Sequence, residues 1–288
     1  GRAGLEGKMQ LLSDLGGGGH GVEKLFGSVP GMAGHEADLE ITGQLGNGSQ
    51  QSAGGAGGNE GISIPIRHKK FMRTMLVVFL WQFSLNCYSS QLNFYLLDTV
   101  GMTQTFYNVI IFLYGPFYML FMGFWRKRIE RTSWFRVFAC SLLIVAPLQI
   151  LYGFVRPGDF TMQLGSLALT VPLYIPLVLL VRVPQHFAGT GHNTAFANFQ
   201  YINMPLTNRD SFTSFYQIVF NLGSLAGMLF GIVFTELTKD FSFTAFGYTY
   251  RTGTPLLTML CGVLELVIIA YVLIGRKRLE PDTDAEHA

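Results

Sequence analysis

Thr105-Phe-Tyr-Asn-Val-Ile110 and Ser214-Phe-Tyr-Gln-Ile-Val219 match position for position, at an offset of 109 residues. At the same offset, Met119-Leu-Phe121 meets Met228-Leu-Phe230. Both copies lie within apolar stretches, and similarity at a fixed offset is typical of a duplicated structural unit. We therefore expect two related units within one domain.

Working outward from this repeat, the chain contains six apolar stretches of about 20 residues or more. At about 1.5 Å per residue, such helices cross an apolar layer of about 30 Å. Residues 161–172, before the fourth stretch, are interpreted as an outer or partly inserted loop. The six predicted spans are Met72–Leu97, Phe106–Trp125, Phe135–Val155, Leu173–Tyr201, Phe212–Leu237 and Pro255–Ile274.

Composition supports an all-α integral membrane protein. Hydrophobic residues make up 49% of the chain and charged residues only 13%, about half the usual share in a soluble domain. A net charge of +2 gives no reason to expect a nucleic-acid partner. The lipid bilayer is the partner that this composition indicates.

Three regions follow from the distribution of residues. Residues 1–66 form a predicted flexible cytoplasmic linker, because glycine-rich sequence with no apolar stretch cannot build a core. Residues 67–279 form the predicted six-helix transmembrane domain. Residues 280–288 form an acidic cytoplasmic tail.

The basic residues predict the orientation. With six spans, the inner segments hold thirteen Lys and Arg residues, whereas the outer segments hold only Arg156, Lys239 and Arg251. The positive-inside rule then places both termini in the cytoplasm. We expect a multi-pass protein of the plasma (inner) membrane. The second and fifth spans cross in opposite directions, so the repeat predicts two inverted three-helix units, 71–155 and 180–275.

Several local motifs resemble a known family. The chain is similar to the C-terminal half of major facilitator superfamily transporters over about residues 66–279. The basic loop of that half usually contains an Asp that this sequence lacks. The motifs that carry the resemblance are Tyr95-Leu-Leu-Asp-Thr-Val-Gly101, Gly123-Phe-Trp-Arg-Lys-Arg-Ile-Glu-Arg131, Gly189-Thr-Gly191, Pro205-Leu-Thr-Asn-Arg209 and Asn221-Leu-Gly-Ser-Leu-Ala-Gly227 with Gly231.

The resemblance implies secondary transport of a small solute by alternating access, with the solute bound between this half and an N-terminal half. On this interpretation the chain is a fragment, a split gene product or a complete half-transporter. One alternative is a self-associating six-helix pore or half-transporter, in which a second copy replaces the N-terminal half. An intramembrane enzyme is the other alternative. We expect no enzyme, catalytic residue or cofactor, since the predicted spans contain neither a Gly-x-Ser-x motif nor paired His boxes.

Polar residues within two spans are candidates for a solute cavity. In the first span, Gln82, Asn86 and Asn93 share one helical face, which suits either a cavity or interhelical hydrogen bonds. In the fourth span the candidates are Gln185, His186, His192 and Asn193. The two histidines are six residues apart, about 240° around a helix, so we expect no metal site.

Two charged residues and three glycines complete the candidate sites. Arg182 and Glu265 are predicted to lie at similar membrane depth, as a structural ion pair, as a proton-coupling pair, or unpaired. Gly223, Gly227 and Gly231 form a predicted packing ridge on the fifth span. The family resemblance would place this ridge against the other half of a transporter.

Overall fold

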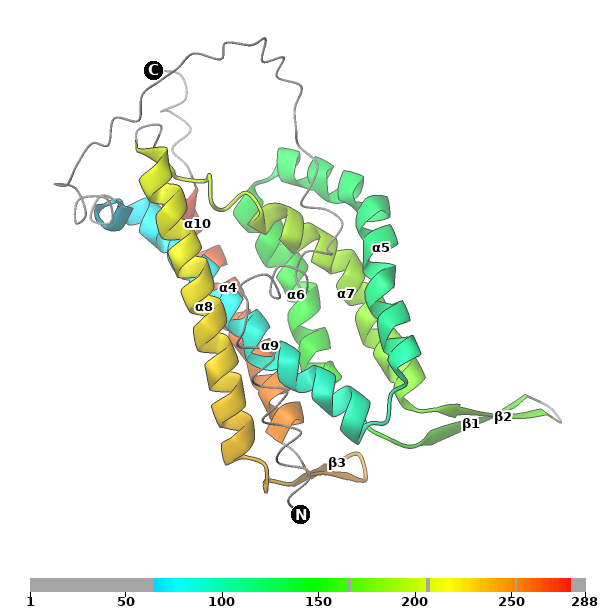
Figure 1. The fold of residues 1–288 in the computed structure, drawn as a ribbon. Coiled ribbons are helices and arrows are strands. Elements are labelled where there is room, and N and C mark those ends of the chain that lie inside the picture. Colours follow the sequence, from blue (N-terminus) through cyan, green and yellow to red (C-terminus); the bar gives the residue numbers. More distant parts are fainter. Residues whose placement is uncertain (1–64, 165–166, 206–207, 252, 281–288) are drawn as a thin grey trace, which may run out of the picture. The chain divides into compact units, whose positions relative to one another are not determined.

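The computed structural model describes residues 65–280 except 165–166, 206–207 and 252. The predicted linker, apart from residues 65–66, and the predicted tail, apart from Glu280, lie outside this part. The main elements are long helices (Figure 1), with a π-helical turn, Tyr95–Thr99, extending the first of them. The long helices are α4 (Lys69–Phe94), α5 (Gln104–Arg131), α6 (Trp134–Tyr152), α7 (Tyr174–Phe196), α8 (Arg209–Leu237) and α9 (Gly253–Ile274), followed by short α10 (Arg276–Leu279).

Four helices, α5, α6, α8 and α9, are long and apolar enough to cross a membrane. They indicate a multi-pass membrane protein. The other two long helices, α4 and α7, have 26 and 23 residues, so they are long enough as well, at about 1.5 Å per residue. α4 and α7 differ in composition from the other four helices because they carry the polar residues singled out in the first and fourth predicted spans.

Local capping fixes where helices begin. The Thr103 hydroxyl accepts a hydrogen bond from the Phe106 amide at the start of α5, and the Ser133 hydroxyl accepts one from Arg136 at the start of α6. Such caps satisfy amides that have no partner within the helix. Asn208, which precedes α8, has a φ of 57°, a conformation that Asn tolerates better than most residues.

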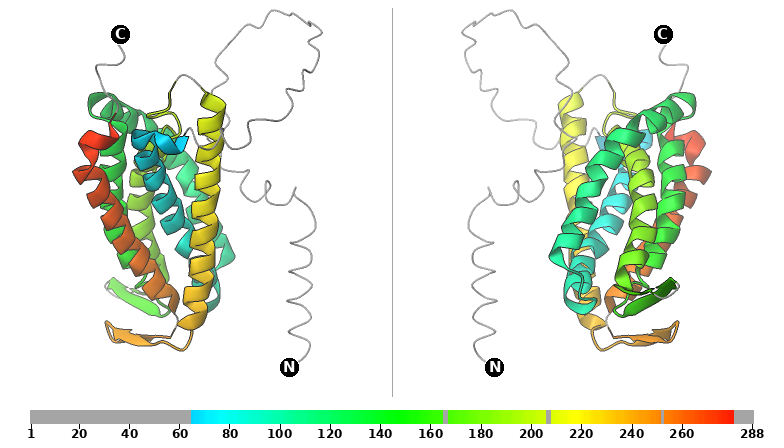
Figure 2. Two further views of the ribbon diagram at one scale, coloured as in Figure 1. Left: turned by 90° about the vertical axis from the view of Figure 1, so that its left-hand side faces the viewer. Right: turned by 90° about the vertical axis from the view of Figure 1, so that its right-hand side faces the viewer.

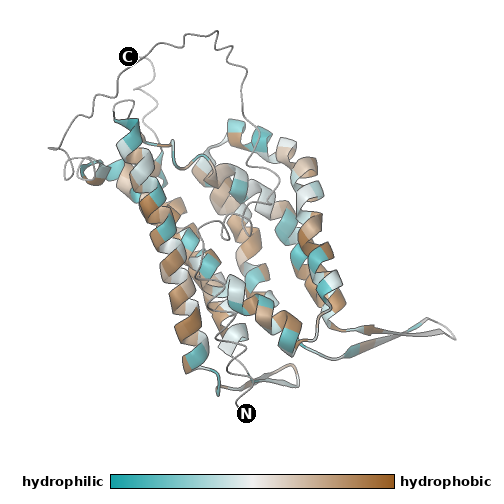
Figure 3. Cartoon of the chain, in the orientation of Figure 1, coloured by the Kyte–Doolittle hydropathy of each residue, from teal (hydrophilic) through white to brown (hydrophobic). Residues whose placement is uncertain are grey.

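The helices pack in a regular scheme. α4 packs against α8 and α9, α7 packs against α5 and α6, and α6 packs against α9 (Figures 1 and 2). α5 and α8 leave large apolar side chains exposed, among them Met119, Leu120 and Leu229, and brown apolar segments run along both helices in Figure 3. Exposed apolar faces of this kind fit contact with lipid or with another membrane protein.

The loop expected at 161–172 is instead an antiparallel hairpin of β1 (Asp159–Leu164) and β2 (Leu167–Pro172). Pairing satisfies the backbone polar groups of both strands, and Thr161 and Thr170 add a side-chain hydrogen bond of 3.2 Å. A second hairpin joins β3 (Phe243–Ala245) to β4 (Tyr248–Tyr250).

The turn of this second hairpin uses an unusual backbone conformation. Phe246 and Gly247 have φ angles of 52° and 73°. Two positive φ angles are what a two-residue type I′ turn requires. Arg156 then donates to the Phe246 carbonyl at 2.8 Å, and the Tyr250 hydroxyl donates to the Phe154 carbonyl at 2.9 Å. These bonds connect the loop after α6 to the second hairpin.

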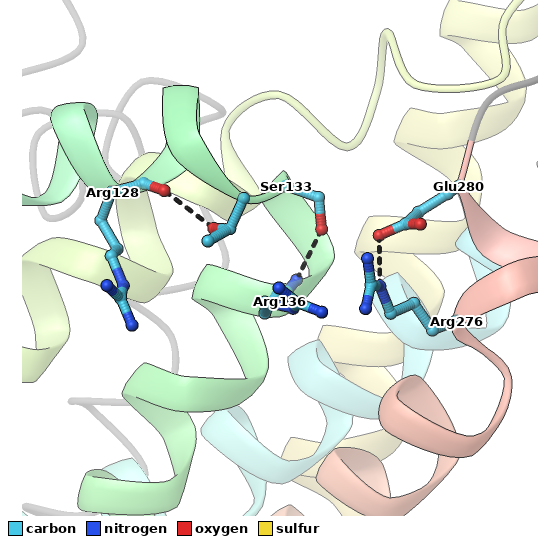
Figure 4. Close-up of polar contacts among 6 residues, drawn as sticks. Arg128, Ser133, Arg136, Arg276 and Glu280 are labelled. Carbon is cyan, nitrogen blue, oxygen red and sulfur yellow. Dashed lines mark hydrogen bonds and ion pairs between the residues drawn. The ribbon is translucent and has the colours of Figure 1, made fainter. Parts of the chain in front are cut away.

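The basic segments meet at the helix ends that lie opposite the two hairpins. Asn203, after α7, donates to the Thr74 hydroxyl near the start of α4 and to the Leu279 carbonyl after α9. Arg276 forms an ion pair of 2.6 Å with Glu280, near Ser133 and Arg136 (Figure 4). The predicted inner segments therefore lie at one end of the helices.

Electrostatics stabilise this basic end. Burial would raise the pKa of Glu280, but hydrogen bonds from Arg276 and Ser133, together with the charges of Arg276 and Arg136, lower it overall. The ionised carboxylate thus stabilises the folded state above its ordinary pKa, and this contribution disappears as the pH falls through the lowered value. Glu280 partly neutralises a dense group of cations there.

The predicted glycine ridge lies against α4 within this chain, so the placement implied by the family resemblance, against another half, is wrong. A Cβ atom on any of the three glycines would collide with a backbone carbonyl of α4. Small residues are needed here because the two helix backbones approach closely. The contacts are Gly223 with Phe79, Gly227 with Phe83, and Gly231 with Cys87.

We predict that Gly227→Ala destabilises the protein by about 1–3 kcal/mol, because overpacking against the Phe83 carbonyl forces the helices apart. Gly115→Ala is the matched control, since a Cβ at Gly115 meets nothing within 4 Å. Thermal unfolding of the purified variants in detergent measures the difference. Equal melting temperatures for the two variants would contradict the close α4–α8 packing.

Candidate functional site

The side chain of Arg182 lies at the centre of a polar network between α6 and α7. Arg182, on α7, is only partly exposed. Its Nε donates to the Tyr152 hydroxyl of α6 at 3.1 Å, and its guanidinium carbon lies 4.6 Å from the centre of the Tyr152 ring. Its Nη1 donates to Gln185 Oε1 at 3.4 Å. The planar guanidinium is thus oriented both by stacking and by hydrogen bonds.

The network continues through two buried amides. Gln185 Nε2 donates to Gln149 Oε1 at 3.1 Å. This contact fixes the orientation of the Gln149 amide, and its Nε2 has no partner among the described residues. A buried donor without a partner costs about 1–3 kcal/mol, so it marks a place where a ligand or water would bind favourably.

Glu265 does not pair directly with Arg182 in this structure. The Glu265 side chain is completely buried, and neither carboxylate oxygen has a hydrogen-bond partner within the described ranges. Tyr88, on α4, lies near both Glu265 and Arg182. The structural ion pair, one of the three predicted arrangements, is therefore absent from the described residues, and the proton-coupling role stays a prediction.

The two histidines of α7 pack against different helices. His186 Nε2 lies 3.0 Å from the Ile110 carbonyl of α5. His192 is buried, its ring lies edge-on to Trp81 of α4 at 4.8 Å, and its Nδ1 has no partner in the described part. No three His, Cys, Asp or Glu side chains in that part gather closely enough to hold a metal ion.

The polar face of the first predicted span makes interhelical hydrogen bonds, one of the two arrangements expected for it. Asn86 donates to Gln82 Oε1 and to the Ser224 hydroxyl of α8, each at 3.2 Å. Ser224 donates in turn to Gln82 Oε1 at 3.1 Å. Gln82 and Asn86 therefore form an interhelical hydrogen-bond network. Asn93 lies apart from it and contacts the Tyr107 hydroxyl of α5.

The last sequence candidate, Asn193, lies exposed on α7 and donates to the Tyr114 hydroxyl of α5 at 2.6 Å. The predicted residues are therefore distributed over several contacts. Arg182 and Gln185 belong to one network, Gln82 and Asn86 to another, and Asn193 to a third.

Several residues of these networks were not singled out from the sequence, namely Gln149, Tyr152, Ser224 and Tyr114. Gln149 and Tyr152 are three residues apart in a mostly apolar span, so they share a helical face. That pair of polar side chains was the signal that could have identified them. Ser224 gave a weaker signal, because serine is common in helix interfaces of membrane proteins.

No protein-family model and no curated protein matches this chain. The resemblance to major facilitator transporters therefore rests on the local motifs alone. The chemistry that the described residues support is recognition by hydrogen bonds and charge.

We predict that Glu265→Gln lowers the free energy of unfolding by less than about 1 kcal/mol, or raises it, because it removes a buried carboxyl group that has no partner among the described residues. Glu236→Gln is the control, since Glu236 forms an exposed ion pair with Lys239. Thermal unfolding in detergent provides the measurement. A loss of about 3–5 kcal/mol would instead indicate that the folded protein pairs an ionised Glu265.

Proposed function

We propose that this chain is a secondary transporter, or half of one, that moves a small solute by alternating access. The observation that carries the proposal is the network around Arg182, which joins polar side chains of α6 and α7 within apolar helices. Charged groups at membrane depth are costly, and they usually mark solute or ion pathways. The proposal involves no covalent chemistry on the solute.

The packing scheme supports the inverted repeat. Exchanging α4 with α7, α5 with α8, and α6 with α9 converts the α4–α8 contact into the α7–α5 contact. It likewise converts α4–α9 into α7–α6, and it leaves α6–α9 unchanged. Two three-helix units of opposite direction, related by a half-turn, would produce this scheme. Transporters commonly bind their solutes at the junction of such repeats.

We further propose that all six long helices cross the membrane. The basic ends then face the cytoplasm and the two hairpins face outward, as thirteen inner against three outer basic residues favour. Lipid contacts only part of this surface. Gln217 and Asn221 on α8 are exposed polar side chains along the helix, and such groups need water or protein partners within a membrane.

These exposed polar side chains support a second half beside this one, with an aqueous pathway between the halves. We assign that position to an N-terminal six-helix half, as the resemblance to major facilitator transporters implies. A second copy of the chain in the same position would make a half-transporter or a self-associating pore. The plasma membrane is the location that we propose.

We predict that a cysteine at Asn221 reacts with a membrane-impermeant maleimide in both right-side-out and inside-out vesicles. Asn221 lies about midway along α8, so reaction from both sides needs an aqueous pathway that opens alternately. The background replaces Cys87, Cys140 and Cys261. Val263→Cys is the matched control, because this exposed apolar residue lies midway along α9 and should face lipid.

Arg209→Cys provides a marker of sidedness and should react only in inside-out vesicles. Reaction of the Asn221 cysteine from one side alone would contradict alternating access. Reaction from both sides together with a steady ion conductance in planar bilayers would instead identify the pore.

A further inference from the structure

The network around Arg182 contains more hydrogen-bond donors than acceptors. An arginine has five N–H donors, and Arg182 uses one on Tyr152 and one on Gln185. Three of the five (5 − 2 = 3) therefore have no partner among the described residues. The Nε2 amide of buried Gln149, one contact further along, adds a donor group that is also unpartnered.

This excess carries an uncompensated positive charge. Glu265, the acid predicted to neutralise Arg182, accepts no hydrogen bond from any described residue. The described partners of Arg182 are a tyrosine and a glutamine, which are neutral. Placing a cation within apolar helices is favourable only when an anion or water compensates it.

We propose that Arg182 and Gln149 form the binding site for an oxyanion, a carboxylate or a phosphate, of a small organic solute. The guanidinium fork matches both groups, because each presents two oxygens to parallel N–H donors. Arg182 is partly exposed rather than fully buried. As a statement about the transported solute, the proposal rests on the transport function above; as a statement about binding, it stands alone.

Depth favours a soluble anion over a lipid headgroup. Arg182 lies eight residues after Tyr174, the first residue of α7, which is about 12 Å along the helix axis. Phosphates of lipids lie at the membrane surface, above the apolar core. A small solute that enters between the helices reaches Arg182 more readily than a headgroup does.

The test is the thermal stability of the purified full chain in a neutral detergent, followed by tryptophan fluorescence. Sodium succinate and sodium phosphate are each compared with sodium chloride of equal ionic strength. Binding to the folded state should raise the melting temperature by about 2–4 °C for at least one of the two. Phosphatidylglycerol, added separately, tests the lipid as the source of the anion.

Arg182→Gln should abolish the shift. Arg156→Gln should retain it and is the matched control, since Arg156 also lies over a tyrosine ring, that of Tyr248, at the hairpin end. If Arg182→Gln does not fold, Arg182→Lys and Gln149→Met take its place. Each should require at least a threefold higher anion concentration for the same shift. Arg182→Lys loses the guanidinium fork, and Gln149→Met loses the unpartnered amide.

The absence of a shift with succinate and phosphate in the unmodified chain would overturn the proposal. So would a shift that persists in Arg182→Gln, or a shift produced only by phosphatidylglycerol. The labelling of Asn221 is independent of this test. If the anion produces an Arg182-dependent shift but Asn221 is labelled from one side only, the anion site stands and the transport function does not. If Asn221 is labelled from both sides but no such shift is seen, the transport function stands and the anion site does not.

Discussion

The architecture depends on one constraint, which is that polar side chains on apolar helices need hydrogen-bond partners that hydrocarbon cannot supply. α4 and α7 carry most of these side chains, and both lie against two other helices. Gln82 and Asn86 of α4 bond to Ser224 of α8, and Arg182 of α7 bonds to Tyr152 of α6. These bonds determine which neighbour each polar helix takes.

The α4–α8 contact and the α5–α7 contact are stabilised in different ways. On the α4–α8 side, three glycines let the backbones approach, and one polar network lies among them. On the α5–α7 side, aromatic residues contact α7, with Tyr114 bonded to Asn193 and Trp125 bonded to the Phe187 carbonyl. The same relative positions in the packing scheme are thus stabilised by different chemistry. The α6–α7 contact contains a cation with unused donors, and in the proposed inverted repeat this difference would give one binding site to two similar units.

The sequence predicted the long helices well, because length and apolar composition are local properties. The hairpin at β1 and β2 escaped prediction, since a short paired segment and an irregular loop look alike in composition. Arg182 was identified by its charge alone. Gln149 was not, because an amide in a helix gains significance only from the neighbour that orients it, here Gln185 from another helix. The partner of the glycine ridge was misplaced for the same reason: the sequence shows small residues but not the surface that they contact.

The central claim is that α4–α6 and α7–α9 are inverted copies and that all six helices cross the membrane. An experimental structure of the chain in a lipid nanodisc tests it most directly. The account predicts that α4–α6 superpose on α7–α9 after a half-turn about an axis in the membrane plane, with both polar helices crossing the bilayer. A structure with α4 or α7 lying along the membrane surface, or with the two units related by an axis normal to the membrane, would contradict it.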